Sequence, residues 1–181
     1  MQTFPSKDIL SIKNNFAAIE TGNSTAAKKL SFVADKLNLL SFKVDGDKKA
    51  LYHLAGVFSS NFFVGNIFSA HELFKKSEII KINFNNLILP IINSTLHNIK
   101  KAGAENSLSG PVERGDLKTI QNHAATLKKH FKRSEDKTFI LNYFVQSLSL
   151  INLIKKSCWK LNNRQRKVEK FLLQELRSYL K

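Results

Sequence analysis

The residues best suited to chemistry lie in one short segment, Leu-Ser-Gly-Pro-Val-Glu-Arg-Gly-Asp, at positions 108–116. Its glycine–proline pair sets a turn, and Gly115 permits a backbone conformation that other residues rarely adopt. Asp116 can accept hydrogen bonds from the first N–H groups of a following helix. Arg114 is therefore held on a short, stiff loop, which suits a guanidinium that meets a carboxylate or a phosphate. The alternative is a well-capped connection between helices that binds nothing.

A second candidate is a polar strip on an otherwise apolar helix. His53, Gly56 and Ser60 fall within a narrow arc, because seven residues make almost two helical turns, and Asn61 lies beside Ser60. A ligand could lie against the backbone at Gly56, with His53 at one end and Ser60 or Asn61 at the other. The alternative is that His53 and Asn61 are buried polar groups satisfied by neighbouring helices.

Other catalytic and metal-binding patterns are absent from the sequence. It holds no HExxH, no glycine-rich phosphate loop and no GxSxG, and His97, His123 and His130 lack the spacing of a metal site. The single cysteine, Cys158, excludes an internal disulfide and a cysteine-based zinc site. We expect no metal, and the residues alone do not show catalysis.

The first third of the chain reads as mixed α/β. We expect a strand at 15–20, a helix at 25–38 with its apolar residues on one face, and a second strand at 39–44. No further strand is predicted, and two strands alone do not make a stable sheet. This β-α-β segment therefore looks like the edge of something larger.

From Asp47 onward the sequence predicts only helices, so the fold class is mainly α. We expect Asp47 to cap the first, Pro90 to kink or break the second, and Gly103 to end it. The first helix is apolar in nearly every direction, which is typical of burial in a bundle or in a subunit interface. The expected helices cover 47–76, 85–101, 116–131, 136–159 and 164–180.

Composition places the chain among globular proteins. It has 181 residues, of which 43% are hydrophobic, enough for one substantial core. The N-terminus lacks the pattern of a signal peptide, and no apolar run reaches the roughly 18–20 residues of a membrane span. We expect a soluble, cytoplasmic protein with no membrane partner.

The net charge of +15 raises the question of nucleic acid. Nine of the 29 basic residues lie at 151–181, where the acidic residues are Glu169 and Glu175. No RNP-like aromatic strand, zinc knuckle or helix-turn-helix accompanies the charge. Because charge is the whole support for this reading, we do not expect nucleic acid as a partner.

Three separated motifs stand out in the sequence, at residues 2–5, 50–61 and 108–116. In their order and spacing they resemble the motifs of the proteins that carry domain of unknown function 2520. The resemblance extends from Met1 to about Ile154. In that family a Rossmann-like NAD(P)-binding domain precedes a helical domain, which is similar to the C-terminal domain of 6-phosphogluconate dehydrogenase.

The resemblance implies an NAD(P)-dependent oxidoreductase whose helical domain dimerises and closes over the nicotinamide and a small-molecule substrate. It also implies a division into the end of a Rossmann-like domain at 1–46 and a helical dimerisation domain at 47–181. When the family's motifs are matched to this sequence residue by residue, the resemblance implies that His53, Ser60 and Asn61 face a cleft as candidate catalytic residues. It also implies a loop beside that cleft, formed by Gly110, Pro111, Arg114 and Asp116.

Two departures limit what the resemblance implies. The dinucleotide fingerprint GxGxxG is absent, so the resemblance has the chain begin near the last strands of a Rossmann domain. Asn61 matches the helix asparagine of the hydroxyacid dehydrogenases, but the lysine that those enzymes carry four residues earlier is Val57 here. The relatives therefore do not identify the reaction. A non-catalytic dimerisation module and a basic, nucleic-acid-associated protein remain as alternatives.

Overall fold

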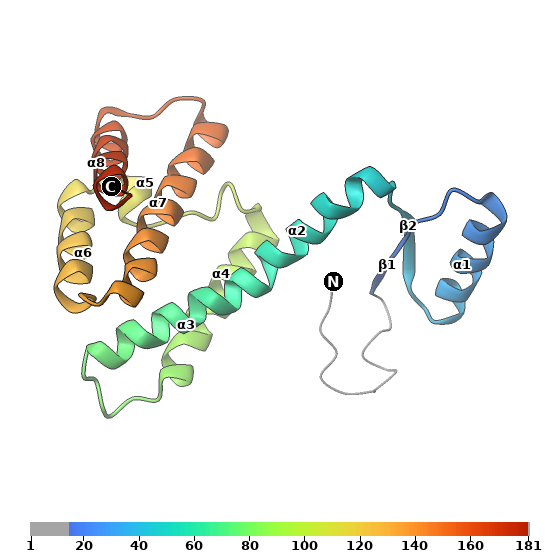
Figure 1. Cartoon of the computed structure of the whole chain (residues 1–181), viewed down its shortest axis with the longest axis horizontal. Helices are drawn as coiled ribbons and strands as arrows, with labels where there is room; N and C mark the ends of the chain where they lie inside the picture. The colour runs from blue at the N-terminus through green and yellow to red at the C-terminus, as the bar shows by residue number, and fades with distance from the viewer. Residues whose placement is uncertain (1–14, 181) are drawn as a thin grey trace. The chain divides into compact units, whose positions relative to one another are not determined.

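The computed structural model describes residues 15–180 and separates the chain into two compact units, Met1–Phe68 and Ser69–Lys181 (Figure 1). The sequence motif at 2–5 lies outside the described residues. The predicted division of the chain between residues 46 and 47 stays a prediction. Within residues 15–180, no helix combines the length and apolarity needed to cross a membrane.

The N-terminal unit begins with the predicted β-α-β segment. Strand β1 (Phe16–Ile19) and strand β2 (Leu40–Lys43) pair in parallel, with Phe16 opposite Leu40. Helix α1 (Ser24–Lys36) connects them, and the Asn23 side chain caps it by accepting from the N–H groups of Thr25 and Ala26. A parallel pair requires such a crossover, so the predicted order of elements is confirmed.

A single helix at 47–76 was expected, and this prediction is wrong. The chain instead forms a 3-10 turn (Gly46–Lys48), helix α2 (Lys49–Ser59) and helix α3 (Asn61–Lys76), with Ser60 between the two helices at φ −123° and ψ −68°. The Ser59 hydroxyl donates to the carbonyl of Ala55, and serine and asparagine side chains compete with the backbone in this way. Asp47 makes no cap and pairs with Lys48.

Helix α4 (Phe84–Ala102) agrees with its prediction at both ends. The Asn83 side chain accepts from the N–H of Asn85, and Gly103 ends the helix at φ 77°. The helix continues through Pro90 without a break. Helices α2, α3 and α4 share one property, which is that none of them contains a buried residue.

The core of the C-terminal unit lies among four helices: α5 (Pro111–Arg114), α6 (Leu117–His130), α7 (Lys137–Cys158) and α8 (Asn163–Tyr179). Figure 1 shows α5 beside α7 and α8, and α5 contacts α6 as well. Fully buried side chains come from α6, α7 and α8, so one core joins them. They are Ile120, Ile140, Phe144, Ile151, Val168 and Leu172.

The apolar stripe predicted on the last helix is confirmed. Val168 and Leu172 are completely buried, and Phe171, Leu176 and Tyr179 pack against the core. Residues three and four apart share one face of a helix, so the stripe turns the charged side chains of α8 toward solvent.

Candidate functional site

The segment at 108–116 folds as a one-turn helix between two unusual glycines. Gly110 has φ 122° and precedes Pro111, which occupies the first position of α5. Proline suits that position because its missing N–H has no partner there in any helix. Gly115 ends the turn with φ 66°, in the left-handed region that favours glycine. The prediction that Gly115 adopts a backbone conformation rare for other residues is confirmed. At Gly110 a turn was expected, and the chain instead begins helix α5 there.

This one-turn helix is fixed against the first turn of α8. A Cβ placed on Gly115 would lie 2.6 Å from the Cβ of Arg164 and 2.8 Å from the backbone N of Gln165. The Gln165 side chain donates to the carbonyl of Glu113 at 2.6 Å, and Val112 is buried in the core. The segment is therefore stiff because of tertiary contacts that the sequence does not reveal.

Arg114 and Asp116 have different surroundings on this rigid segment. The Arg114 side chain is exposed. The Asp116 carboxylate caps α6, accepting from the Thr119 N–H at 3.1 Å and from the Thr119 hydroxyl at 2.7 Å. These hydrogen bonds hold the pKa of Asp116 below its usual range, and the charges of Arg114 and His123 act in the same direction. The predicted cap is confirmed, and the exposed guanidinium is available to an anion.

We expect Asp116→Asn to make stability less dependent on pH. A lowered pKa in the folded state means that the ionised carboxylate stabilises the fold above the pKa of the unfolded chain, and that this contribution disappears as pH falls through the folded pKa. Asparagine caps helices about as well as aspartate but does not titrate. In thermal unfolding followed by circular dichroism, the gap in Tm between wild type and variant should narrow below about pH 4. A gap that stays constant from pH 7 to pH 2.5 would contradict this.

A histidine–tyrosine pair lies in the same unit as this segment. The Nδ1 atom of His123, on α6, is 3.1 Å from the hydroxyl of Tyr143, on α7. Burial raises the pKa of Tyr143, against a hydrogen bond with Ser147 that lowers it. Burial thus favours the protonated phenol, whose hydroxyl can share a hydrogen bond with Nδ1 of His123. The sequence does not predict this pair, because its two residues lie on separate helices.

The polar strip of the N-terminal unit is divided by the end of a helix. His53 is exposed on α2, Asn61 is exposed at the start of α3, and Ser60 lies between the helices. The Ser60 N–H donates to the carbonyl of Gly56 at 3.0 Å, which keeps these two positions close. The alternative for His53 and Asn61 was that they are buried polar groups satisfied by neighbouring helices. Both side chains are exposed among the described residues of this chain, which does not support that alternative.

The two groups of predicted site residues belong to different compact units. His53, Ser60 and Asn61 lie in Met1–Phe68, whereas the segment at 108–116 lies in Ser69–Lys181. That they line one cleft stays a prediction. Among the residues that the structure describes, no three histidine, cysteine or acidic side chains gather as a metal site would require.

Two solved structures share the fold. The chain is similar to "putative NADP oxidoreductase BF3122 from Bacteroides fragilis", with 27% identity and a TM-score of 0.68 over 83% of this chain and 54% of that one. It is also similar to protein TM1727 from Thermotoga maritima, with 24% identity and a TM-score of 0.65 over 78% of this chain and 53% of that one. The chain thus spans about half the length of each. Among curated proteins no relative matches the sequence.

A protein-family model matches residues 15–139, which include α2, α3, α4, the one-turn helix α5 and all of α6. Its description is domain of unknown function 2520. The match covers more than half of the chain and contains both groups of candidate site residues. The chain therefore belongs to the family of domain of unknown function 2520.

Proposed function

We propose that this chain supplies the substrate-facing, helical part of an NAD(P)-dependent oxidoreductase. The observation that carries the proposal is the structural similarity of this chain, through most of its own length, to a protein described as a "putative NADP oxidoreductase". Fold likeness alone does not give function, so the proposal also needs groups on this chain that could serve such a reaction.

The chain's own residues do not fit a dinucleotide. A dinucleotide fingerprint places three glycines between a strand and a helix, whereas the connection from β1 to α1 contains only Gly22. The nucleotide would therefore be held by a part of the enzyme beyond this chain. When bound, the cofactor supplies hydride transfer.

The residues of this chain would orient the substrate and move a proton. Arg114 would anchor an anionic group, because it is exposed on a segment that tertiary contacts make rigid. His53 would act as acid or base, with Ser60 and Asn61 as hydrogen-bonding partners of the substrate. His123 with Tyr143 is a second acid–base pair, in the same compact unit as Arg114.

We also propose that the chain is a homodimer through α2, α3 and α4. These helices bury no residue within the chain, yet each carries large apolar side chains that are 40% exposed or more. Apolar surfaces of this kind on a helix mark an interaction site. Examples are Leu51, Phe58, Phe62, Val64, Leu89 and Ile91.

The oxidoreductase proposal is tested with a chimera. This chain is fused to the part of the Bacteroides fragilis protein that it does not match, and the chimera is titrated with NADPH while nicotinamide fluorescence is recorded. The intact Bacteroides fragilis protein is the reference. We expect the chimera to bind NADPH. A folded chimera that fails to bind where the reference binds would favour the non-catalytic dimerisation module.

Arg114→Ala should weaken the binding of an anionic probe, inorganic phosphate, to the chimera at least tenfold, because a hydrogen bond to a charged group contributes about 1.5–3 kcal/mol. The Tm should change little, since the side chain is exposed. Lys129→Ala is the matched control, because it removes one exposed positive charge from α6 in the same compact unit. If Arg114→Ala lowered stability as much as it lowered binding, the loop would be a structural connection only.

A further inference from the structure

Trp159 occupies a position that packing does not explain. It ends α7 in the left-handed conformation, at φ 59°, and its side chain is 93% exposed. Glycine or asparagine is the usual residue at such a position, because a Cβ is disfavoured there. The chain thus places its one tryptophan where the backbone disfavours it and where the ring contacts almost nothing.

The segment that carries Trp159 is anchored on both sides. Ile154 is buried before it and Leu161 after it, and the Arg166 guanidinium donates to the carbonyl of Leu161 at 3.2 Å. The ring is therefore presented by a fixed turn. A large, exposed ring on an anchored turn is suited to stack on another flat group.

The helix that follows presents a basic face to solvent. At about 100° per residue, Arg166, Lys170 and Arg177 fall within about 40° of one another, opposite the buried Val168 and Leu172. The span from Arg166 to Arg177 is about 16 Å at 1.5 Å per residue.

The acidic residues of α8 lie off this face and are neutralised. Glu169 pairs with Lys155 of α7, and Glu175 pairs with Lys128 of α6. Among the described side chains of α8, no carboxylate interrupts the row from Arg166 to Arg177. Three of the five arginines in the chain lie on this one helix, and guanidinium is the cation that fits phosphate oxygens best.

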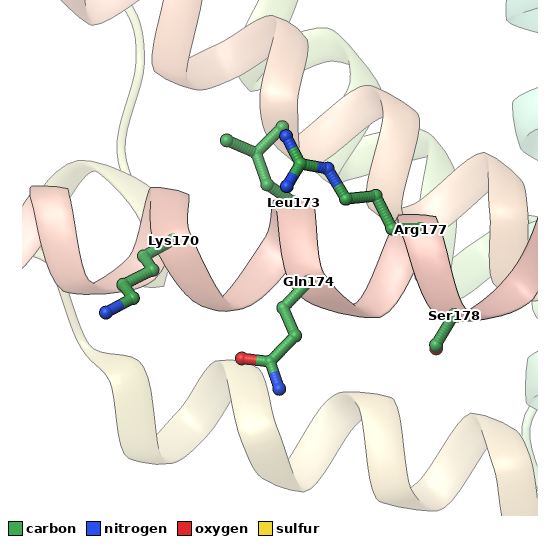
Figure 2. A pocket seen from close by; sticks show the side chains of 5 residues that line it. All are labelled: Lys170, Leu173, Gln174, Arg177 and Ser178. Atoms are coloured by element: carbon green, nitrogen blue, oxygen red, sulfur yellow. The ribbon is translucent and has the colours of Figure 1, made fainter.

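Part of the basic face is hollowed. Figure 2 shows an open depression in which every lining side chain comes from α8, with the Arg177 side chain reaching back along the helix toward Leu173. The depression has a volume of about 570 Å³. Lys170, Gln174 and Ser178 also line it, so two cations and two neutral hydrogen-bonding groups surround the apolar side chain of Leu173. Such a surface suits a phosphate backbone.

We propose that Trp159 and the outer face of α8 bind single-stranded nucleic acid. The cations contact successive phosphates, and the exposed indole stacks on a base, which is how proteins hold single strands without reading sequence. A lipid surface fits less well, because an interfacial helix must insert its apolar face, and that face of α8 is buried in the core. This inference does not depend on the proposed oxidoreductase role.

The test uses a 15-nucleotide oligothymidine and the fluorescence of Trp159, the one tryptophan of the chain. We expect quenching on binding, and affinity that falls with salt with a slope of about −0.7 for each phosphate contacted. The double variant Lys170→Glu with Arg177→Glu should raise the Kd at least tenfold. Trp159→Phe, followed with a labelled oligonucleotide, should bind more tightly than Trp159→Ala.

The matched control is Lys28→Glu with Lys29→Glu, which changes net charge equally at exposed positions on α1. This control should change the Kd less than twofold. Equal weakening by both double variants would show general attraction and overturn the proposal. So would binding without tryptophan quenching, or quenching by phosphatidylserine vesicles but not by the oligonucleotide.

Discussion

Gly115→Ala should lower the free energy of unfolding by about 2–4 kcal/mol. Two effects combine at this position. The backbone has φ 66°, which disfavours any side chain, and the added methyl would meet the backbone of α8 rather than a flexible side-chain end. The carbonyl of Glu113 would also lose its position relative to the Gln165 side chain.

Urea unfolding followed by circular dichroism measures this change. Gly22→Ala is the matched control, because Gly22 does not have a positive φ and a Cβ there would meet nothing within 4 Å. We expect the control to change stability by less than about 0.5 kcal/mol, as for surface positions generally. Equal effects of the two substitutions would mean that the contact between α5 and α8 contributes little.

The elements predicted well from sequence are those whose signals are local. Asp116 before α6 and Gly103 after α4 act within one helical turn, so their roles could be assigned from residue type alone. The break at Ser60 was missed because neither glycine nor proline marks it. It depends on a balance between serine side chains and the backbone, which periodicity does not report.

The candidate site could be predicted only where its residues are close in sequence. Arg114 was found because two glycines and a capping carboxylate surround it within a few positions. His123 and Tyr143 are 20 residues apart in the sequence and lie on different helices. Gly115 and Arg164, which lie close together in the fold, are separated by even more residues. These contacts follow from how α6, α7 and α8 pack, and one sequence does not specify that packing in advance.

Phe58→Glu should raise the dissociation constant of the proposed dimer at least a hundredfold. Burying a phenylalanine contributes about 1.5–3 kcal/mol, and a carboxylate placed in the same interface adds the cost of removing its water. The sum exceeds the roughly 2.8 kcal/mol that corresponds to a hundredfold change. The ring of Phe58 is 68% exposed in the single chain and lies 4.8 Å from that of Phe62, so both would be covered together by a second copy.

Sedimentation equilibrium over a range of concentrations gives this constant for each variant. Phe32→Glu is the matched control, because Phe32 is 61% exposed on α1, outside the three helices assigned to the interface. We expect the wild-type chain and the control to dimerise alike, and Phe58→Glu to sediment as a monomer. A wild-type chain that stays monomeric at tens of micromolar would contradict the dimer proposal, and the exposed faces of α2, α3 and α4 would then need another partner.

The result also bears on catalysis, because His53 shares α2 with Phe58. A second copy packed on this helix would decide which side of His53 stays open to substrate.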